Sequence, residues 1–308
     1  MKIGTNYSYD LGVKQLTGLA SQATSLQNQI SANKRITTSS VDPVAAARIA
    51  TINRRQAENT QNASNITLAQ TLVSQSDSAL ESIQTQLQRA KELALNAANG
   101  TLNDDDRKGI AQELKSITDD LFALVNQRDA RDTPLFGGSA SGDAFVRDAT
   151  GAISYAGSGD APPIPIGASG NINATDSGEK LFMSIDVNGV TTDMFTILGN
   201  LTSALETGAN GDPNALKDAM NAGLDGIDAS LAQVTASRSS FGARGARLDL
   251  EAERLDTAKT DSEEQKTALD GFDLQASIAN LQQTMLVLQA SQASFSQLSK
   301  LSLFDYLR

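Results

Sequence analysis

The sequence contains no cysteine and no histidine in its 308 residues. The lack of cysteine excludes disulfide bonds and thiolate chemistry, and the lack of histidine removes the commonest general base and metal ligand. Tryptophan is also absent, and aromatic residues make up only 4% of the chain. Any core must therefore be built mainly from Leu, Ile, Val and Ala. We expect no cofactor, and only carboxylate, Lys, Ser and Tyr chemistry stays open to an enzyme.

Basic residues are also fewer than acidic ones. The chain has 25 Lys and Arg residues against 36 Asp and Glu residues, a net charge of −11. This balance disfavours binding to nucleic acid, which needs a basic surface, and to an anionic membrane. The sequence has no run of about 18 apolar residues, so we expect no transmembrane helix. The first residues lack the apolar segment of a secretory signal, so we expect a cytoplasmic chain or export by a route without a cleaved signal.

Apolar residues instead follow a helical spacing at both ends of the chain. A first helix over about residues 9–33 carries a heptad frame of Tyr9, Leu16, Leu19, Ala23, Leu26 and Ile30. The pair Asp42-Pro43 predicts the start of a second helix, and Asn99-Gly100 predicts its end. A helix of about 55 residues with a sustained heptad is typical of a coiled coil.

Further helices follow the same pattern. Asn103 with Asp104–Asp106 predicts the start of a third helix, and Asp212-Pro213 predicts the start of a fourth. A final helix carries the apolar residues Leu274, Ile278, Leu281, Met285, Leu288 and Phe295. Because a heptad seam on a lone helix has nothing to pack against, the early helices are expected to pair with the late ones.

The middle of the chain differs in composition. Residues 137–193 are rich in Gly and contain Pro162-Pro163 and Pro165. We predict strands at Phe145-Val146, Ile153–Tyr155 and Leu181–Val187, a hairpin turn at Asn188-Gly189, and a helix over residues 194–207. The middle therefore resembles a small insert between two helical halves.

These patterns predict a mainly α fold: an elongated antiparallel coiled-coil or helical-bundle rod from the N- and C-terminal segments, with a small β-rich inserted domain in the middle. We divide the chain into a terminal coiled-coil assembly domain (1–42 and 265–308), a helical rod domain (43–138 and 208–264) and an inserted outer domain (139–207). The terminal helices have few apolar anchors for the entropy lost on ordering. We therefore expect them to be mobile in a free monomer and to order on assembly.

Some polar groups allow two interpretations. Asp104–Asp106 could bind a cation, but a helix N-terminus that favours negative charge is the simpler interpretation. Glu263-Glu264 and Asp119-Asp120 could be catalytic carboxylates, but a solvated helix face explains them better. Arg238 occupies a core position of the fourth helix, where it either sets the register or extends to solvent.

Several segments at the two ends carry a resemblance to a known family. They are Met1 to Thr5, Gln29 to Ile36, Ser40 to Arg48, Asn65-Ile66, Ala90 to Ala94 with Asn99-Gly100, Leu135 to Gly138, Arg238 to Gly242, Arg244, and Ser299 to Leu307. On these residues the chain resembles the flagellin-like hook-associated proteins of the FlgL family, which form the flagellar hook–filament junction. Residues Ser39-Ser40-Val41 depart from the Pro-Ser-Asp usual in that family. We expect local variation there.

The resemblance implies a structural adaptor, not an enzyme. Such a protein is exported unfolded through the flagellar type III channel and is located at the distal end of the hook. Its implied partners are identical copies in a ring, the first hook–filament junction protein, flagellin, and an export chaperone that holds the C-terminal helix. The residues expected to form the assembly interface are Leu16, Leu19, Leu26, Ile30, Leu274, Ile278, Leu281, Met285, Leu288 and Phe295.

The nearest alternative is flagellin itself. The C-terminal motif Leu303, Phe304, Asp305 and Tyr306 argues against it, since flagellins usually end without the Phe-Asp-Tyr turn. A sensory or adhesive coiled-coil protein outside the flagellum is a second alternative, and an enzyme is a third.

Overall fold

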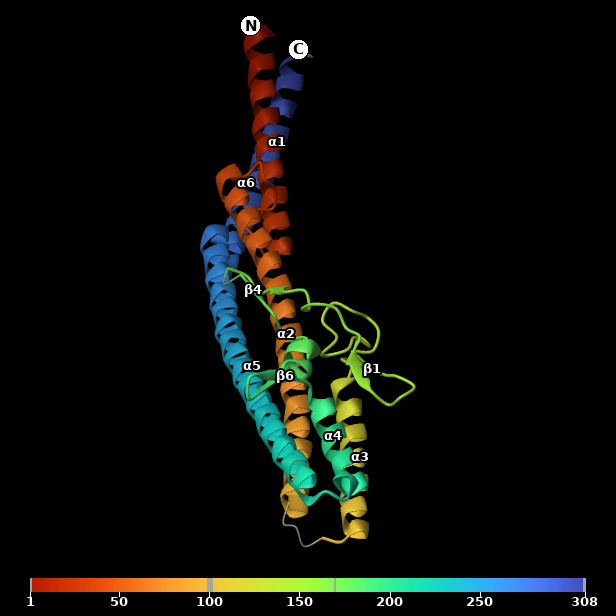
Figure 1. The fold of residues 1–308 in the computed structure, drawn as a ribbon. Coiled ribbons are helices and arrows are strands. Elements are labelled where there is room, and N and C mark those ends of the chain that lie inside the picture. The colour runs from red at the N-terminus through yellow and green to blue at the C-terminus, as the bar shows by residue number, and fades with distance from the viewer. Residues whose placement is uncertain (1, 99–101, 169, 307–308) are drawn as a thin grey trace. The chain divides into compact units, whose positions relative to one another are not determined.

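The computed structural model describes residues 2–98, 102–168 and 170–306 (Figure 1). Its helices are α1 (Lys2–Ala32), α2 (Pro43–Ala98), α3 (Asp104–Val125), α4 (Met194–Thr207), α5 (Pro213–Asp270) and α6 (Leu274–Tyr306). Long helices from the two ends of the chain pack together, and a small β-containing region lies between them in sequence, so the prediction of a mainly helical fold is confirmed. Across these described ranges, we find no helix with the length and apolarity that crossing a membrane requires.

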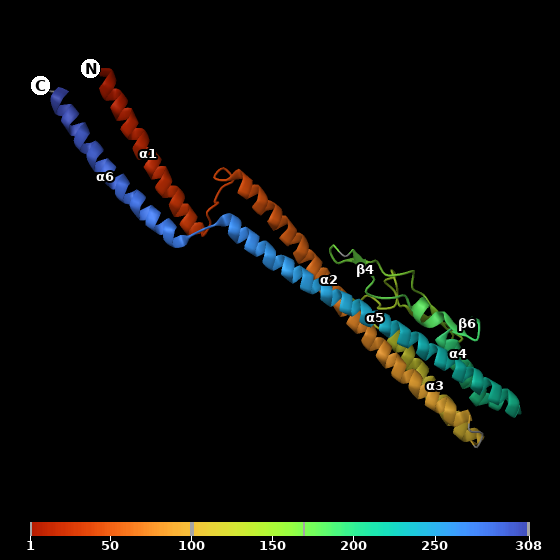
Figure 2. The same cartoon turned by 90° about the vertical axis from the view of Figure 1, so that its left-hand side faces the viewer.

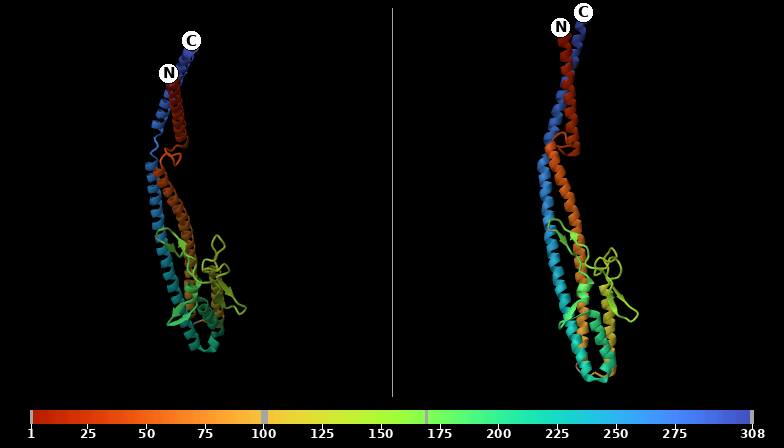
Figure 3. Two further views of the ribbon diagram at one scale, coloured as in Figure 1. Left: turned by 90° about the horizontal axis from the view of Figure 1, so that it is seen from above. Right: turned by 45° about the horizontal axis from the view of Figure 1, so that its top comes forward.

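The chain forms two compact units. The terminal unit consists of Met1–Glu58 and Thr257–Arg308, and the central unit consists of Asn59–Asp256. In the terminal unit, α1 lies antiparallel beside α6 (Figures 2 and 3). The division into three domains drawn from the sequence stays a prediction.

The second, third and fourth predicted helices begin where the sequence predicts, whereas α1 begins at Lys2, earlier than the predicted residue 9. Asp42 Oδ1 accepts a hydrogen bond of 3.0 Å from the Ala45 amide at the start of α2, which is 56 residues long. Asn103 accepts one of 2.8 Å from Asp106 at α3, and Asp212 accepts one of 2.9 Å from Asn214 at α5. Each side chain satisfies an amide that has no partner within its helix. The end predicted at Asn99-Gly100 lies outside the described residues.

The core belongs to the central unit. A heptad frame in α2 is buried from Ile66 to Ala97, at Ile66, Ala69, Val73, Ser76, Leu80, Ile83, Leu87, Ala90, Ala94 and Ala97. On α5, residues spaced by seven are fully buried at Met220, Ile227, Val234, Phe241 and Leu248, and the next residue in the series, Leu255, is half-buried. The α3 seam adds Leu114, Ile117 and Leu121 to the same cluster. The heptad patterns thus identify the interior of the central unit.

The β region contains three two-stranded antiparallel sheets within the described residues. The strands are β1 (Phe145–Arg147), β2 (Ile153–Tyr155), β3 (Ile164–Pro165), β4 (Asn171–Ile172), β5 (Ile185–Val187) and β6 (Val190–Thr192). β1 pairs with β2, with Phe145 opposite Tyr155. Asn188 and Gly189 form the predicted turn between β5 and β6, with φ of 55° and 85°, as a two-residue turn of this type requires.

The prediction of one strand over Leu181–Val187 is wrong in its first half. Residues Glu179–Met183 form a short π-helix, and only Ile185–Val187 are a strand. Leu181 and Phe182 are both buried, and successive side chains of a strand point to opposite faces. A helical turn allows both neighbours to enter the core. The sequence analysis also missed β3 and β4.

Most of the interior aromatic contacts are gathered at one place. Phe182 contacts Phe136 and Phe145, with ring centroids 5.4 and 6.0 Å apart in edge-on geometry. Phe145 in turn contacts Tyr155 on β2 and Phe195 on α4 at 5.3 and 5.8 Å. Such edge-on pairs stabilise a fold beyond the apolar area that they bury. The cluster therefore holds the inserted strands on the helices of the central unit.

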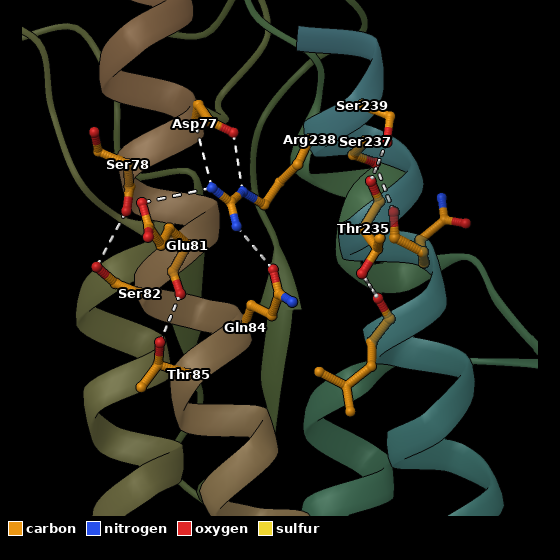
Figure 4. Close-up of polar contacts among 12 residues, drawn as sticks. Asp77, Ser78, Glu81, Ser82, Gln84, Thr85, Thr235, Ser237, Arg238 and Ser239 are labelled. Atoms are coloured by element: carbon orange, nitrogen blue, oxygen red, sulfur yellow. Dashed lines mark hydrogen bonds and ion pairs between the residues drawn. The ribbon is translucent and has the colours of Figure 1, made fainter. Parts of the chain in front are cut away.

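A polar network joins α2 and α5 in the middle of the central unit (Figure 4). Arg238 Nε donates to Asp77 Oδ1 at 3.0 Å, and one terminal nitrogen donates to Gln84 Oε1 at 3.0 Å. The other terminal nitrogen lies 3.5 Å from Glu81 Oε2. The hydrogen bond with Asp77 raises the pKa of the Arg238 guanidinium above its ordinary value. Because the partners span two turns of α2, they favour the register-setting interpretation of Arg238.

Replacing Arg238 with Met is expected to lower the free energy of unfolding of the central unit by about 1–2 kcal/mol, because a half-buried charged donor loses its partners. Urea unfolding followed by circular dichroism measures this. The matched control is Arg89→Met, since the Arg89 side chain is 52% exposed against 29% for Arg238. Exposed pairs contribute little, so the control is expected to change stability by less than about 0.5 kcal/mol. Equal effects of the two substitutions would exclude a special role of Arg238.

Candidate assembly interface

The pair of α1 and α6 brings together part of the predicted seams. Leu16, Leu19, Leu26 and Ile30 of α1 are half-buried, as are Leu281, Leu288 and Phe295 of α6. The Tyr9 and Phe295 rings contact each other with centroids 4.7 Å apart. A Cβ at Gly12 would lie 2.8 Å from Phe295 Cε2, so only glycine allows this close approach. These contacts set how near the two helices come.

Half of the predicted α6 seam does not face α1. Leu274, Ile278 and Met285 are 44%, 40% and 47% exposed. The face that is least exposed steps through Ser277, Leu281, Thr284, Leu288, Ser291 and Phe295. Large apolar and small polar residues alternate along it, and Leu274, Ile278 and Met285 form a flanking edge. Whether both edges serve in assembly stays a prediction.

The terminal unit has almost no core of its own. Among its described residues, the fully buried apolar side chains are Ala45 and Ile52, and both are in α2. The most exposed apolar side chains of α1 and α6 are Tyr7, at 69%, and Leu286, at 67%. Exposed apolar residues gathered on a helix pair are typical of a site of protein association. The two helices therefore present apolar surface that a neighbouring subunit could bury.

A groove of 490 Å³ runs between α1 and α6 on the same surface. Its apolar lining comes from Tyr7, Leu11 and Leu16 on one side and Val287 and Phe295 on the other. Residues 274–297 of α6 contain no charged side chain. The surface can thus be buried against apolar groups without desolvating a charge on α6.

Arg35 joins the loop between α1 and α2 to the C-terminus of α5. Its Nε donates to the Asp270 carbonyl at 2.8 Å and a terminal nitrogen donates to the Leu269 carbonyl at 2.9 Å, at the C-terminus of α5. Asp270 Oδ1 accepts the Arg35 amide at 3.0 Å in return. A cation at a helix C-terminus is favourable because the last carbonyls have no partners within the helix. The loop between α1 and α2 is thereby tied to the loop between α5 and α6.

Asp42 completes this arrangement on the other side of Arg35. The hydrogen bond from the Ala45 amide holds the pKa of Asp42 below its ordinary value, and Arg35 at 3.3 Å contributes to the same shift. The sequence predicts Asp42 as a helix cap, but it does not indicate that Arg35 and Asp270 are partners. Gly271, with φ of 50°, and the helix cap at Asp273 were the local signals for the break between α5 and α6.

The predicted C-terminal motif lies at the end of α6. Helical backbone covers Leu303, Phe304, Asp305 and Tyr306, but their side chains lie outside the described part of the chain. Their role in the assembly stays a prediction.

Asp104–Asp106 occupy the first turn of α3, and Asp104 pairs with Arg107 one turn along. Within the described ranges there is no group of three or more carboxylates positioned to hold a metal ion. The helix N-terminus therefore accounts for this acidic run.

Comparison with known proteins agrees with this arrangement of helices. The bacterial flagellin N-terminal helical region matches residues 3–141, and the bacterial flagellin C-terminal helical region matches residues 224–307. The flagellar hook-associated protein 3 of Escherichia coli (strain K12) is 29% identical over 99% of this chain and 99% of its own length. The chain belongs to the flagellar hook-associated protein 3 (FlgL) family. This family is structural and non-enzymatic.

Two further relatives show a similar fold and a weaker likeness to flagellin. A putative flagellar hook-associated protein from Vibrio parahaemolyticus has a similar fold, with a TM-score of 0.68 and 24% identity over 75% of this chain and 100% of that one. The flagellin of Listeria monocytogenes is 22% identical over 96% of this chain and 95% of its own length. The hook-associated protein 3 of Escherichia coli is thus more similar than this flagellin over nearly the same length of the chain, which favours the FlgL interpretation over flagellin.

Proposed function

We propose that this protein is the adaptor through which the flagellar filament is joined to the hook and on which flagellin begins to polymerise. As a member of the FlgL family, it is a structural component of the bacterial flagellum at the hook–filament junction. The observation that carries the proposal is the likeness to hook-associated protein 3 over nearly the whole of both chains.

The proposed way of assembly rests on the terminal unit. We propose that α1 and α6 pack against the same helices of identical copies in a ring, against the first junction protein, and against flagellin. The exposed apolar residues of both helices and the sparse core of the terminal unit support this, since only further burial can offset the cost of ordering them. The central unit has its own core and forms a separate folded part.

The proposed route to the hook is export as an unfolded chain through the type III channel, with a chaperone that holds the C-terminal helix. An exposed α6 that carries no charge over residues 274–297 fits such a chaperone, because an apolar helix face is a common recognition surface. The absence of cysteine agrees with this route as well.

Deletion of the gene tests the proposed function. Cells without the protein are expected to carry hooks without filaments and to release flagellin into the medium, and a plasmid copy of the wild-type chain is expected to restore filaments. Electron microscopy counts hooks and filaments, and an immunoblot of the medium measures flagellin. Normal filaments on the deletion strain would refute the proposal.

A further inference from the structure

A second groove of the terminal unit lies between the start of α2 and the end of α5. It has a volume of 820 Å³ and is lined on one side by Pro43, Val44, Ala47, Arg48, Thr51, Ile52 and Arg55, and on the other by Gln265, Ala268 and Leu269. Val44 is 65% exposed there. The lining is mostly apolar, and its charged residues are Arg48 and Arg55, which are seven residues apart on α2 and therefore share one face of the helix.

These arginines differ from the others in the chain. Arg48, Arg54 and Arg55 are exposed, and none makes a hydrogen bond or ion pair within the part of the chain that the structure describes. Every other arginine with a described side chain interacts with another group of the chain. Residues 43–56 contain these three cations and no carboxylate. A basic strip therefore borders an apolar groove in a chain whose net charge is −11.

Two carboxylates lie on α5, the helix on the other side of the groove. Asp261 and Glu264 of α5 come four residues before Gln265 and Ala268, which line the groove, so they share its helix face. Both are exposed and make no ion pair among the described residues. The same face thus carries two unpaired cations and two unpaired carboxylates beside exposed apolar groups.

We propose that this face binds a second copy of the chain, with Arg48 and Arg55 of one copy against Asp261 and Glu264 of the other and the apolar groove buried between them. Two copies that each carry a charge of −11 repel each other, so they approach most readily where a basic strip meets an acidic one. The inference rests on the proposed function, since it names the surface by which identical junction subunits meet outside α1 and α6.

Charge reversal with rescue between two chains tests this contact. The variants are R48E/R55E and D261R/E264R, each expressed in the deletion strain. Each variant alone brings like charges together across the contact and is expected to lower the number of filaments per cell at least about tenfold. Expressed together, the two variants are expected to restore filaments, because each altered surface then meets one of opposite charge.

The control matched to R48E/R55E is K108E/K217E, which lowers the net charge by the same amount at exposed lysines of the central unit. It is expected to leave the filament number unchanged. Circular dichroism of each purified chain, and an immunoblot of the medium, check that the variants fold and are exported.

Separate outcomes would overturn the inference. A wild-type number of filaments with either variant alone would do so. So would lack of rescue in the mixed strain when both chains are folded and exported, because the arginines then meet a different protein. Rescue only when all four substitutions are in one chain would show pairing within a copy, which also contradicts the proposal. Failure of the proposed function itself is distinct, since then the wild-type plasmid would not restore filaments.

Discussion

Replacing Leu281 with Asp is expected to leave the central unit folded and to abolish incorporation of the protein at the tip of the hook. Leu281 is half-buried on the face of α6 that pairs with α1. A carboxylate there loses the apolar contact and must be desolvated whenever the helices pair, which costs far more than the substitution of an exposed residue. The terminal unit has few other buried groups to offset this loss.

Two measurements on the Leu281→Asp variant separate assembly from folding. Immunoblots of purified hooks and of the medium show whether the exported chain is incorporated, and urea unfolding reports the stability of the central unit. The control Leu250→Asp makes the same chemical change at a leucine of the central unit that is 60% exposed. Wild-type motility of cells with the Leu281 variant would contradict a role of this seam.

The sequence predicted the helices of the central unit well because one period determines their packing. Ile66, Leu80 and Leu87 belong to the core of the central unit, and the heptad positions of α2 are buried from Ile66 to Ala97. The caps at Asp42, Asn103 and Asp212 were also predictable, since a cap depends only on a side chain and the amides that follow it. Local chemistry was sufficient for these features.

The inward face of α6 could not be predicted in the same way. Two frames share Leu281, Leu288 and Phe295, and they differ in whether Met285 or Thr284 faces the partner helix. Apolar spacing favours Met285, but in the structure Thr284 is buried and Met285 is 47% exposed. Which of these residues faces inward depends on the side chains of α1, and the apolar pattern of α6 alone gives no information about them.

Contacts between distant residues were missed for a similar reason. Arg35 and Asp270 are 235 positions apart, and nothing in the spacing of either segment indicates that they meet. The π-helix at Glu179–Met183 depends on the aromatic groups around Phe182, which come from other parts of the chain. Tertiary packing overrode the local preference for a strand there.

Replacing Phe182 with Ala is expected to produce the largest loss of stability, about 3–5 kcal/mol in the central unit. The Phe182 side chain is fully buried, and its ring contacts both Phe136 and Phe145. The surroundings are too constrained to close the cavity, because a Cβ at Gly178 would already lie 2.5 Å from the Phe145 ring. Urea unfolding followed by circular dichroism measures the change.

The control for this prediction is Phe182→Leu, which keeps most of the volume and is expected to cost less than about 1.5 kcal/mol. Hydrogen exchange of the amides gives an independent test, because the inserted strands are anchored through Phe145 and Tyr155 and are expected to lose protection before α2 and α5 do. A loss below about 1 kcal/mol for Phe182→Ala would mean that the insert is held by its backbone pairing instead. The long helices would then support the insert without depending on the aromatic cluster, and assembly through the terminal unit would tolerate changes throughout the middle of the chain.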